Sequence, residues 1–147
     1  VAATTPLGTL TLADAYASEP LTWVFTAVGQ RVELIWTSTG WKVQKIVCAG
    51  TESLLTTETA KPLVAIHLMN VNGTNDYIIP SGVVAGQRST WIVTAGSTAS
   101  TISGLFYTTA GAATGVDLAI NAASDMAVLE WDGARWLGIN LVSVTVA

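Results

Sequence analysis

LIWTSTGW (residues 34–41) and LEWDGARW (residues 129–136) follow one pattern, an apolar run that ends in two tryptophans around four turn-forming residues. The tryptophans are Trp36 and Trp41 in the first stretch and Trp131 and Trp136 in the second. Both pairs have the same offset, since 131 − 36 = 95 and 136 − 41 = 95. Alternating apolar runs on both sides of a short turn predict a β-hairpin, in which the two tryptophans face each other across the strands.

The alternation assigns the tryptophans to faces that we expect to be buried. The apolar residues on the same face as the first tryptophan are Val32 and Leu34 in one hairpin and Ala127 and Leu129 in the other. Successive side chains of a strand point to opposite sides, so these faces are apolar throughout. We expect hairpin-closing core pairs or pairs at a subunit interface, and ligand binding by exposed indoles is the alternative.

The similarity between the two stretches extends upstream of the tryptophans. Residues 21–36 align without a gap on residues 116–131, and the apolar positions agree at every second residue. Identity is low, so either an internal duplication or convergence on one strand–turn–strand pattern accounts for the match. We expect a single β domain over residues 1–147 that contains two related β units, at about 1–50 and 62–147.

Most of the remaining chain is predicted to form short strands separated by Gly, Pro, Asn and Ser. These strands are expected at 7–15, 21–27, 63–71, 76–80, 89–96, 100–109 and 116–123. Their spacing is typical of an antiparallel β-sandwich or barrel, jelly-roll-like in type. The best helix candidate is TESLLTTETAK (51–61). Its threonines are poor helix formers, so a single helical turn or a loop is an equal alternative to a longer helix. The sequence therefore predicts an all-β fold with at most one short helix.

The composition predicts a soluble protein that covers much of its surface with other subunits. Of the 147 residues, 11% are charged and 50% hydrophobic, against about 25% charged in an ordinary soluble domain. A membrane-spanning helix needs about 18 uninterrupted apolar residues, and polar residues interrupt every apolar run well before that length. We therefore expect a homo-oligomer without a membrane partner. The sequence begins with Val1, which suggests processing or a piece of a longer protein, and no signal peptide is recognisable.

The charges do not predict a nucleic-acid partner. The formal net charge is −4, and nucleic-acid binding requires clustered cations that displace phosphate counterions. The six basic residues are scattered, at Arg31, Lys42, Lys45, Lys61, Arg88 and Arg135.

No residue pattern predicts catalysis, a metal site or a cofactor. His67 lies inside the apolar run VAIHLMNV, where we expect a half-buried, hydrogen-bonded histidine. The alternative is that copies of His67 meet around a symmetry axis and bind a metal, but no metal-ligand spacing accompanies it. Cys48 stands alone in the run IVCAG and is expected to be a small buried thiol rather than a nucleophile.

Three polar residues beside the second tryptophan pair have two interpretations. Glu130 and Asp132 flank Trp131, and Arg135 precedes Trp136. They are expected to be an edge-strand charge, a turn aspartate and a turn arginine. The alternative is a hydrogen-bonding group beside an aromatic platform for a sugar.

The order of several short motifs resembles a β module of tailed-bacteriophage virion proteins, found in tail fibres, head fibres and capsid decoration proteins. In that module a strand ending in Ile-Pro leads to Ala-Gly-Gln, then to an apolar strand and Thr/Ser-rich repeats, and finally to Trp-Asp-Gly-x-x-Trp. The matching residues are Ile79-Pro80, Ala85-Gly86-Gln87, Thr90 to Val93 and Leu129 to Trp136. The match covers about residues 77–140, and residues 21–47 match only its closing half.

The resemblance implies an all-β homotrimer on the virion surface. It implies a structural or host-adhesion role, with the major capsid protein or a fibre protein as partners and a host surface glycan as a further partner. It implies no enzymatic activity, no cofactor and no catalytic residue.

Overall fold

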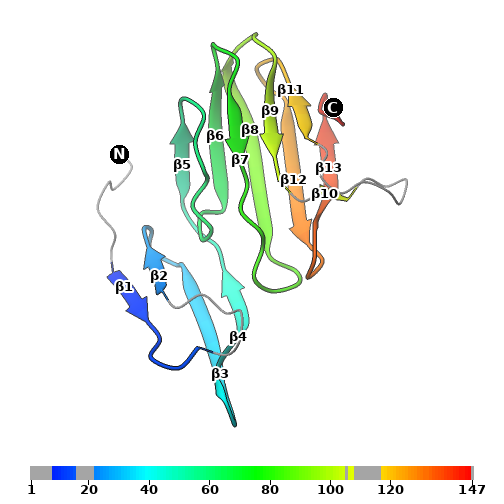
Figure 1. The fold of residues 1–147 in the computed structure, drawn as a ribbon. Helices are drawn as coiled ribbons and strands as arrows, with labels where there is room; N and C mark the ends of the chain where they lie inside the picture. Colours follow the sequence, from blue (N-terminus) through cyan, green and yellow to red (C-terminus); the bar gives the residue numbers. More distant parts are fainter. Residues whose placement is uncertain (1–7, 16–21, 105, 108–116, 147) are drawn as a thin grey trace.

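Strands are the only regular secondary structure among the residues that the structure describes. The computed structural model describes residues 8–15, 22–104, 106–107 and 117–146 (Figure 1). Their strands are β1 (Gly8–Thr11), β2 (Thr22–Phe25), β3 (Arg31–Thr37), β4 (Gly40–Val47), β5 (Thr51–Leu54), β6 (Ile66–Val71), β7 (Asp76–Ile78), β8 (Arg88–Gly96), β9 (Ser100–Ser103), β10 (Phe106–Tyr107), β11 (Leu118–Ile120), β12 (Met126–Trp131), β13 (Trp136–Val142) and β14 (Thr145–Val146). The predicted all-β fold is confirmed.

The helix considered for residues 51–61 does not form. Thr51–Leu54 is strand β5, which pairs in parallel with β6. Glu52 and Leu54 are buried while Thr51 and Ser53 are exposed, which is the two-residue period of a strand. The inward alternation of TESL, with a paired strand beside it, outweighs the helix propensity of its Glu and Leu.

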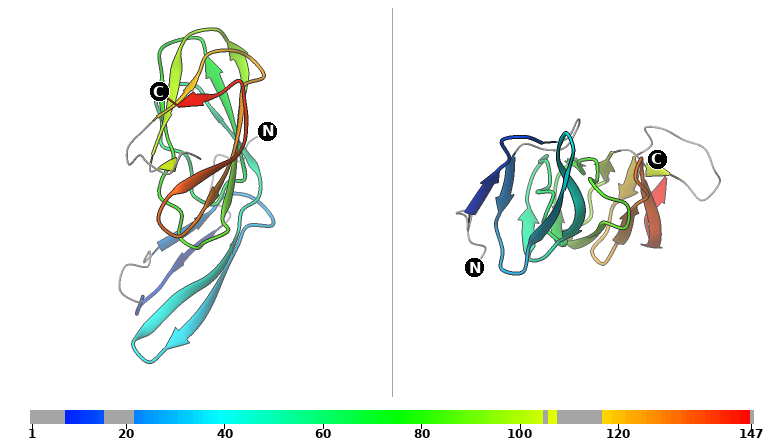
Figure 2. Two further views of the ribbon diagram at one scale, coloured as in Figure 1. Left: turned by 90° about the vertical axis from the view of Figure 1, so that its right-hand side faces the viewer. Right: turned by 90° about the horizontal axis from the view of Figure 1, so that it is seen from below.

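Two large sheets pack face to face as a sandwich (Figure 2). One has the strand order β10-β13-β12-β8-β6-β5 and the other β14-β11-β9-β7. Both contain antiparallel and parallel pairs, because β5–β6, β6–β8, β7–β9 and β10–β13 run in parallel. Fully buried side chains from both sheets meet between them, among them Trp91, Tyr77 and Ile102.

The first four strands form a smaller body next to this sandwich, below it in the view of Figure 1. Strands β1 and β2 form one antiparallel sheet and β3 and β4 another. A second apolar cluster lies here, centred on Trp23, Val43 and Leu63. Leu63 comes from the segment between β5 and β6, so the chain that follows the four strands closes their core.

The two tryptophan hairpins have the same register, residue for residue. In β3–β4, Arg31 is opposite Val47, and 95 positions later Met126 is opposite Val142 in β12–β13. Both registers shift once, which leaves Gln44 unpaired in the first hairpin and residue 139 unpaired in the second (44 + 95 = 139). An extra residue of this kind is a β-bulge. Because of it, Ile46 rather than Val47 shares a face with Val43 and lies against the apolar cluster.

The turns that lead into the two hairpins are built alike. The Gln30 side chain accepts hydrogen bonds from the backbone N–H groups four and three residues before it, at 2.6 and 3.1 Å. Asp125, 95 positions later, accepts the two N–H groups in the same relative positions at 2.8 and 3.0 Å. Gly29 and Ser124, one residue earlier in each turn, both have a positive φ, +92° and +79°. Different side chains thus satisfy the same backbone groups.

The strand pairs that cover the hairpins also correspond. Leu10 of β1 is opposite Trp23 of β2, and Ile102 of β9 is opposite Leu118 of β11. Trp23 and Leu118, in the second strand of each pair, are again 95 positions apart. Leu10 and Ile102, in the first strand of each pair, are 92 positions apart, so the segment that connects the two strands is three residues longer in the pair β9–β11. Below, β1–β4 are called the N-terminal unit, and β9 with β11–β13 the C-terminal unit.

Candidate functional site

The second tryptophan pair lies in the core of the sandwich. Trp131 and Trp136 are opposite each other in β12 and β13, with ring centroids 5.4 Å apart and planes at 63°. Only 4% and 2% of their surfaces are exposed. The Trp136 Nε1–H donates a hydrogen bond to the Pro80 carbonyl at 2.9 Å, so the one polar atom of this indole is satisfied.

The segment between β7 and β8 covers this pair. The Gly86 N–H donates to the Trp131 carbonyl at 2.8 Å, and the Trp131 N–H donates to the Gln87 carbonyl at 2.9 Å. Gly82 lies against the indole, because a Cβ atom built there would be 2.2 Å from Cγ of Trp131. The burial of the pair therefore depends on a segment about fifty residues away in sequence.

Replacing Gly82 with alanine is expected to lower the free energy of unfolding by about 1–3 kcal/mol, because the added methyl group overlaps a buried indole. Gly73→Ala is the matched control, since the nearest atom to its Cβ would be 4.0 Å away. Urea unfolding followed by circular dichroism measures both. Equal stability of the two variants would show that the segment does not press on Trp131.

The first pair is exposed in the single chain, so the expectation of a core pair was wrong here, while the alternative of a subunit interface stays a prediction. Trp36 and Trp41 are opposite each other at the end of β3–β4, with ring centroids 5.2 Å apart and planes at 70°. Their exposed fractions are 52% and 37%. The pair has the geometry of the buried one, but among the described residues no segment covers it as residues 80–87 cover its counterpart. It stands beside a turn of three hydroxyl-bearing residues, 37–39.

Two of the polar residues beside the buried pair, Glu130 and Asp132, make contacts within the fold. Glu130 Oε2 forms an ion pair with Arg88 Nε at 2.7 Å, across β12 and β8. Because β12 has a neighbouring strand on both sides, the prediction of an edge-strand charge was wrong. Asp132 Oδ1 accepts the backbone N–H groups of Ala134 and Arg135, both at 2.7 Å. These two hydrogen bonds hold the pKa of the Asp132 carboxyl below its usual range. Since the indoles here are buried, this hairpin does not combine an aromatic platform with these carboxylates.

A buried ionic group that the sequence did not reveal lies between β5 and β6. His67 is 2% exposed, its Nδ1 is 2.8 Å from Glu52 Oε1, and its ring stacks on Trp91 at 4.4 Å. Glu52 also accepts the Lys61 backbone N–H at 2.9 Å and forms an ion pair with Lys61 Nζ at 3.1 Å. His67 is thus hydrogen-bonded as predicted, but fully rather than half buried, so it presents no ring nitrogen to a neighbouring subunit.

The hydrogen bonds to Glu52 determine its charge state. Burial alone raises the pKa of this carboxyl, but the hydrogen bond and charge of His67 and the hydrogen bonds from Lys61 outweigh burial and hold the pKa below its usual range. Glu52 is therefore ionised at neutral pH inside the protein.

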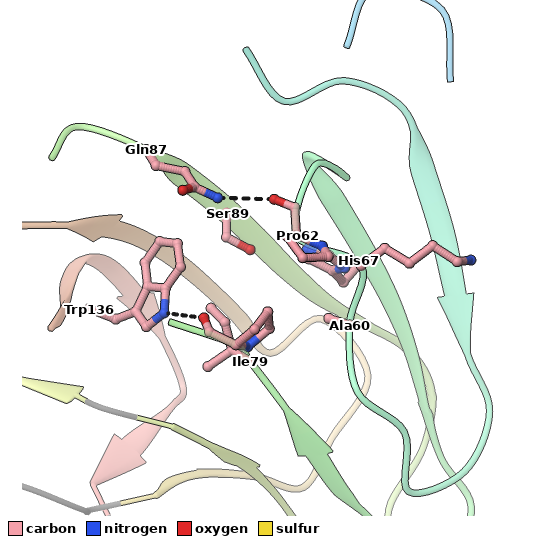
Figure 3. A pocket seen from close by; sticks show the side chains of 9 residues that line it. Ala60, Pro62, His67, Ile79, Gln87, Ser89 and Trp136 are labelled. Carbon is pink, nitrogen blue, oxygen red and sulfur yellow. Dashed lines mark hydrogen bonds between the residues drawn. The ribbon is translucent and has the colours of Figure 1, made fainter. Parts of the chain in front are cut away.

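The cavity beside His67 is too small for a substrate. Side chains of β6, β8 and β13 line it, including His67, Ser89 and Trp136 (Figure 3). Its volume is 10 Å³, about the space that one water molecule requires. The Ser89 hydroxyl accepts the Trp91 Nε1–H at 2.8 Å. A histidine held by a carboxylate is also the arrangement of a catalytic base, but the ring of His67 is buried and stacks on Trp91.

A shallower groove of 290 Å³ lies where β4 meets the large sheet, and Cys48 lines it with Ile46, Ile66 and Arg88. Burial raises the pKa of the Cys48 thiol, although a hydrogen bond with Gln87 opposes the shift. A thiol with a raised pKa is a poor nucleophile, because the thiolate is the reactive form. Cys48 is half buried rather than fully buried, and the groove has an apolar lining.

Within the part of the chain that the structure describes, no three His, Cys, Asp or Glu side chains come together as metal ligands. None of the described segments is a helix long and apolar enough to cross a membrane. No family model matches the chain, and no curated protein matches it.

Proposed function

We propose that the chain is a non-enzymatic structural module of a bacteriophage particle, which assembles through its apolar surfaces and stabilises the virion or projects from it. The observation that carries the proposal is the exposed Trp36–Trp41 pair, whose counterpart in the same chain is buried. An indole pair of fixed geometry on the surface is typical of a contact site.

Other exposed apolar side chains support assembly. Large apolar residues that are more than a third exposed are Val24, Val28, Ile35, Leu55, Ile78, Ile139, Leu141, Val142 and Val146. With only 11% charged residues, the chain has few side chains that keep such surfaces apart in solution. Burial against further subunits accounts for both features.

The assignment to a phage particle rests on the order of motifs between residues 77 and 140. Pro80 of Ile79-Pro80 and the motif Ala85-Gly86-Gln87 belong to the segment that covers the buried tryptophan pair, and Leu129 to Trp136 contains that pair. The motifs therefore belong to one packed unit, which supports their being inherited together. The proposal itself requires only an oligomer, and the resemblance implies that this oligomer is a trimer.

A host-glycan-binding module is the second candidate. The exposed indoles lie next to the Thr37–Thr39 turn, and the Thr37 hydroxyl is hydrogen-bonded to the Gly40 carbonyl at 2.7 Å. Exposed aromatic faces with hydroxyl groups beside them suit a sugar, whose C–H faces stack on indoles. In this proposal the sugar platform is Trp36 and Trp41, not the residues around Asp132.

Light scattering on the full chain at micromolar concentration is expected to give an oligomer, and Trp36→Ala/Trp41→Ala is expected to shift it towards monomers. Iodide quenching of tryptophan fluorescence, with and without host polysaccharide, separates the two candidates. Indoles that the polysaccharide protects in a monomeric chain would support glycan binding. A monomer whose quenching does not respond to polysaccharide would contradict both.

A further inference from the structure

The sheets of the C-terminal unit have further strands on one side that the N-terminal unit lacks among the described residues. In the C-terminal unit β12 pairs with β13 on one edge and with β8 on the other, and β9 pairs with β11 and β7. Their counterparts β3 and β1 pair only with β4 and β2 among the described strands. Strands β8 and β7 extend the two layers in the same direction (Figure 1), so the N-terminal unit has two open strand edges on one side.

The open side leaves apolar core residues partly exposed. Val32 and Leu34 of β3 are half buried, although they face the apolar cluster. Their counterparts Ala127 and Leu129 are 0% exposed, because β8 lies beside them with Trp91 opposite Ala127. The edge of β3 thus lacks the antiparallel neighbour that the corresponding edge of β12 has.

The sequence of β3 is complementary to itself when two copies run antiparallel. A two-fold axis that passes between the two Val32 residues defines the register. Each residue then lies opposite the residue of the second copy whose number, added to its own, gives 64. Arg31 is then opposite Glu33 of the second copy, and Glu33 is opposite Arg31, while the two Val32 side chains meet. Opposite charges directly across two antiparallel strands stabilise the pair. In the single chain Arg31 and Glu33 contact each other at 3.0 Å, and both side chains remain accessible.

This register pairs the first residues of β3. Residues 31–33 of each copy lie opposite one another, whereas the residues before Arg31 form the turn after β2, in which Gly29 has a φ of +92°. An isologous contact repeats the Arg31–Glu33 pairing twice, once on each side of the axis.

We propose that β3 is a dimerisation edge, which pairs antiparallel with β3 of a second copy and joins the two hairpins into one sheet of order β4-β3-β3-β4. This inference names the partner of the apolar surface in the proposed oligomer and so rests on the proposed function. Its two-fold symmetry gives dimers in place of the trimer that the resemblance implies.

Charge reversal on the full chain tests the register. In Arg31→Glu positions 31 and 33 are both negative, and in Glu33→Arg both are positive, so each variant places like charges across the axis. Each is expected to dimerise about tenfold more weakly or worse, because like charges meet at the interface. Mixing the two variants in equal amounts is expected to restore dimers, since every cross-axis pair is then of opposite sign. Sedimentation equilibrium measures all three samples.

Arg88→Glu is the matched control. It makes the same change in net charge as Arg31→Glu and breaks an ion pair with Glu130, but on a strand edge that is already occupied. It is expected to dimerise like the unchanged chain. Failure of the mixture to recover would assign the effect to the ion pair within one chain and overturn the inference.

The remaining outcomes separate the inference from the proposed function. A trimer that both charge reversals leave intact would overturn pairing through β3 while leaving the structural assembly module standing. A chain that stays monomeric across the measured concentrations would contradict both.

Discussion

Replacing Trp136 with alanine is expected to lower the free energy of unfolding by about 3–5 kcal/mol, whereas Trp41→Ala is expected to lower it by about 1 kcal/mol. The two residues occupy the same position in equivalent hairpins, since 136 − 41 = 95. Trp136 is 2% exposed and its indole N–H is hydrogen-bonded, so its removal leaves a cavity and an unpaired Pro80 carbonyl. Trp41 is 37% exposed and loses mainly its contact with Trp36.

Urea unfolding followed by far-ultraviolet circular dichroism measures both variants without relying on the tryptophan signal. Both are measured at low protein concentration, where association contributes little to apparent stability. Comparable losses for the two variants would contradict the burial difference on which the proposed contact site depends.

Removing the buried carboxylate in Glu52→Ala is expected to lower the free energy of unfolding by about 2–4 kcal/mol, because two donors inside the protein lose their acceptor. Glu52 is 6% exposed and accepts hydrogen bonds from both His67 and the Lys61 backbone. Its loss leaves these donors unsatisfied inside the protein. Glu52→Gln keeps an acceptor oxygen and is expected to lose less.

The same carboxylate makes stability depend on pH at the acid end. The pKa of Glu52 in the folded protein lies below that of an exposed glutamate, about 4.3, so the folded state favours the ionised form. Its stabilisation is fully present above the unfolded-state pKa and is lost as the pH falls through the folded-state pKa. A series of urea unfolding curves from pH 6 downwards is expected to show a shallower loss in Glu52→Gln than in the unchanged chain. Glu58→Gln, at an exposed position, is the control, and identical slopes in all three proteins would exclude Glu52 as the source.

The sequence predicts the hairpins well because their determinants are local. Alternating apolar residues and a short turn place Trp36 opposite Trp41, and the constant offset of 95 extends to the pairing of both hairpins. The all-β class follows from the same alternation. The leucines and glutamates of residues 51–61 suggested a helix, but residues 51–54 form a strand with alternating exposed and buried side chains.

The features that the sequence did not predict depend on distant segments. Whether an indole pair is buried is decided by residues 80–87, which cover one hairpin and not the other, and neither hairpin sequence encodes that difference. The pairing of Glu52 with His67 depends on the parallel register of β5 and β6, which brings together residues 15 positions apart. The apolar run around His67 predicted a half-buried, hydrogen-bonded histidine but could not name its partner.

Both hairpins have a bulge at equivalent positions, 44 and 139, so their inward-facing and outward-facing residues follow the same order. A strand has a period of two, so one extra residue exchanges the inward and outward sides of everything that follows it. In the first hairpin this phase change turns Ile46 towards the apolar cluster just before the chain passes into β5. A single-residue deletion there would reverse the facing of the last residues of β4 while leaving its composition almost unchanged. The chain can therefore tolerate extensive divergence between the two hairpins in residue type, but not in the number of residues.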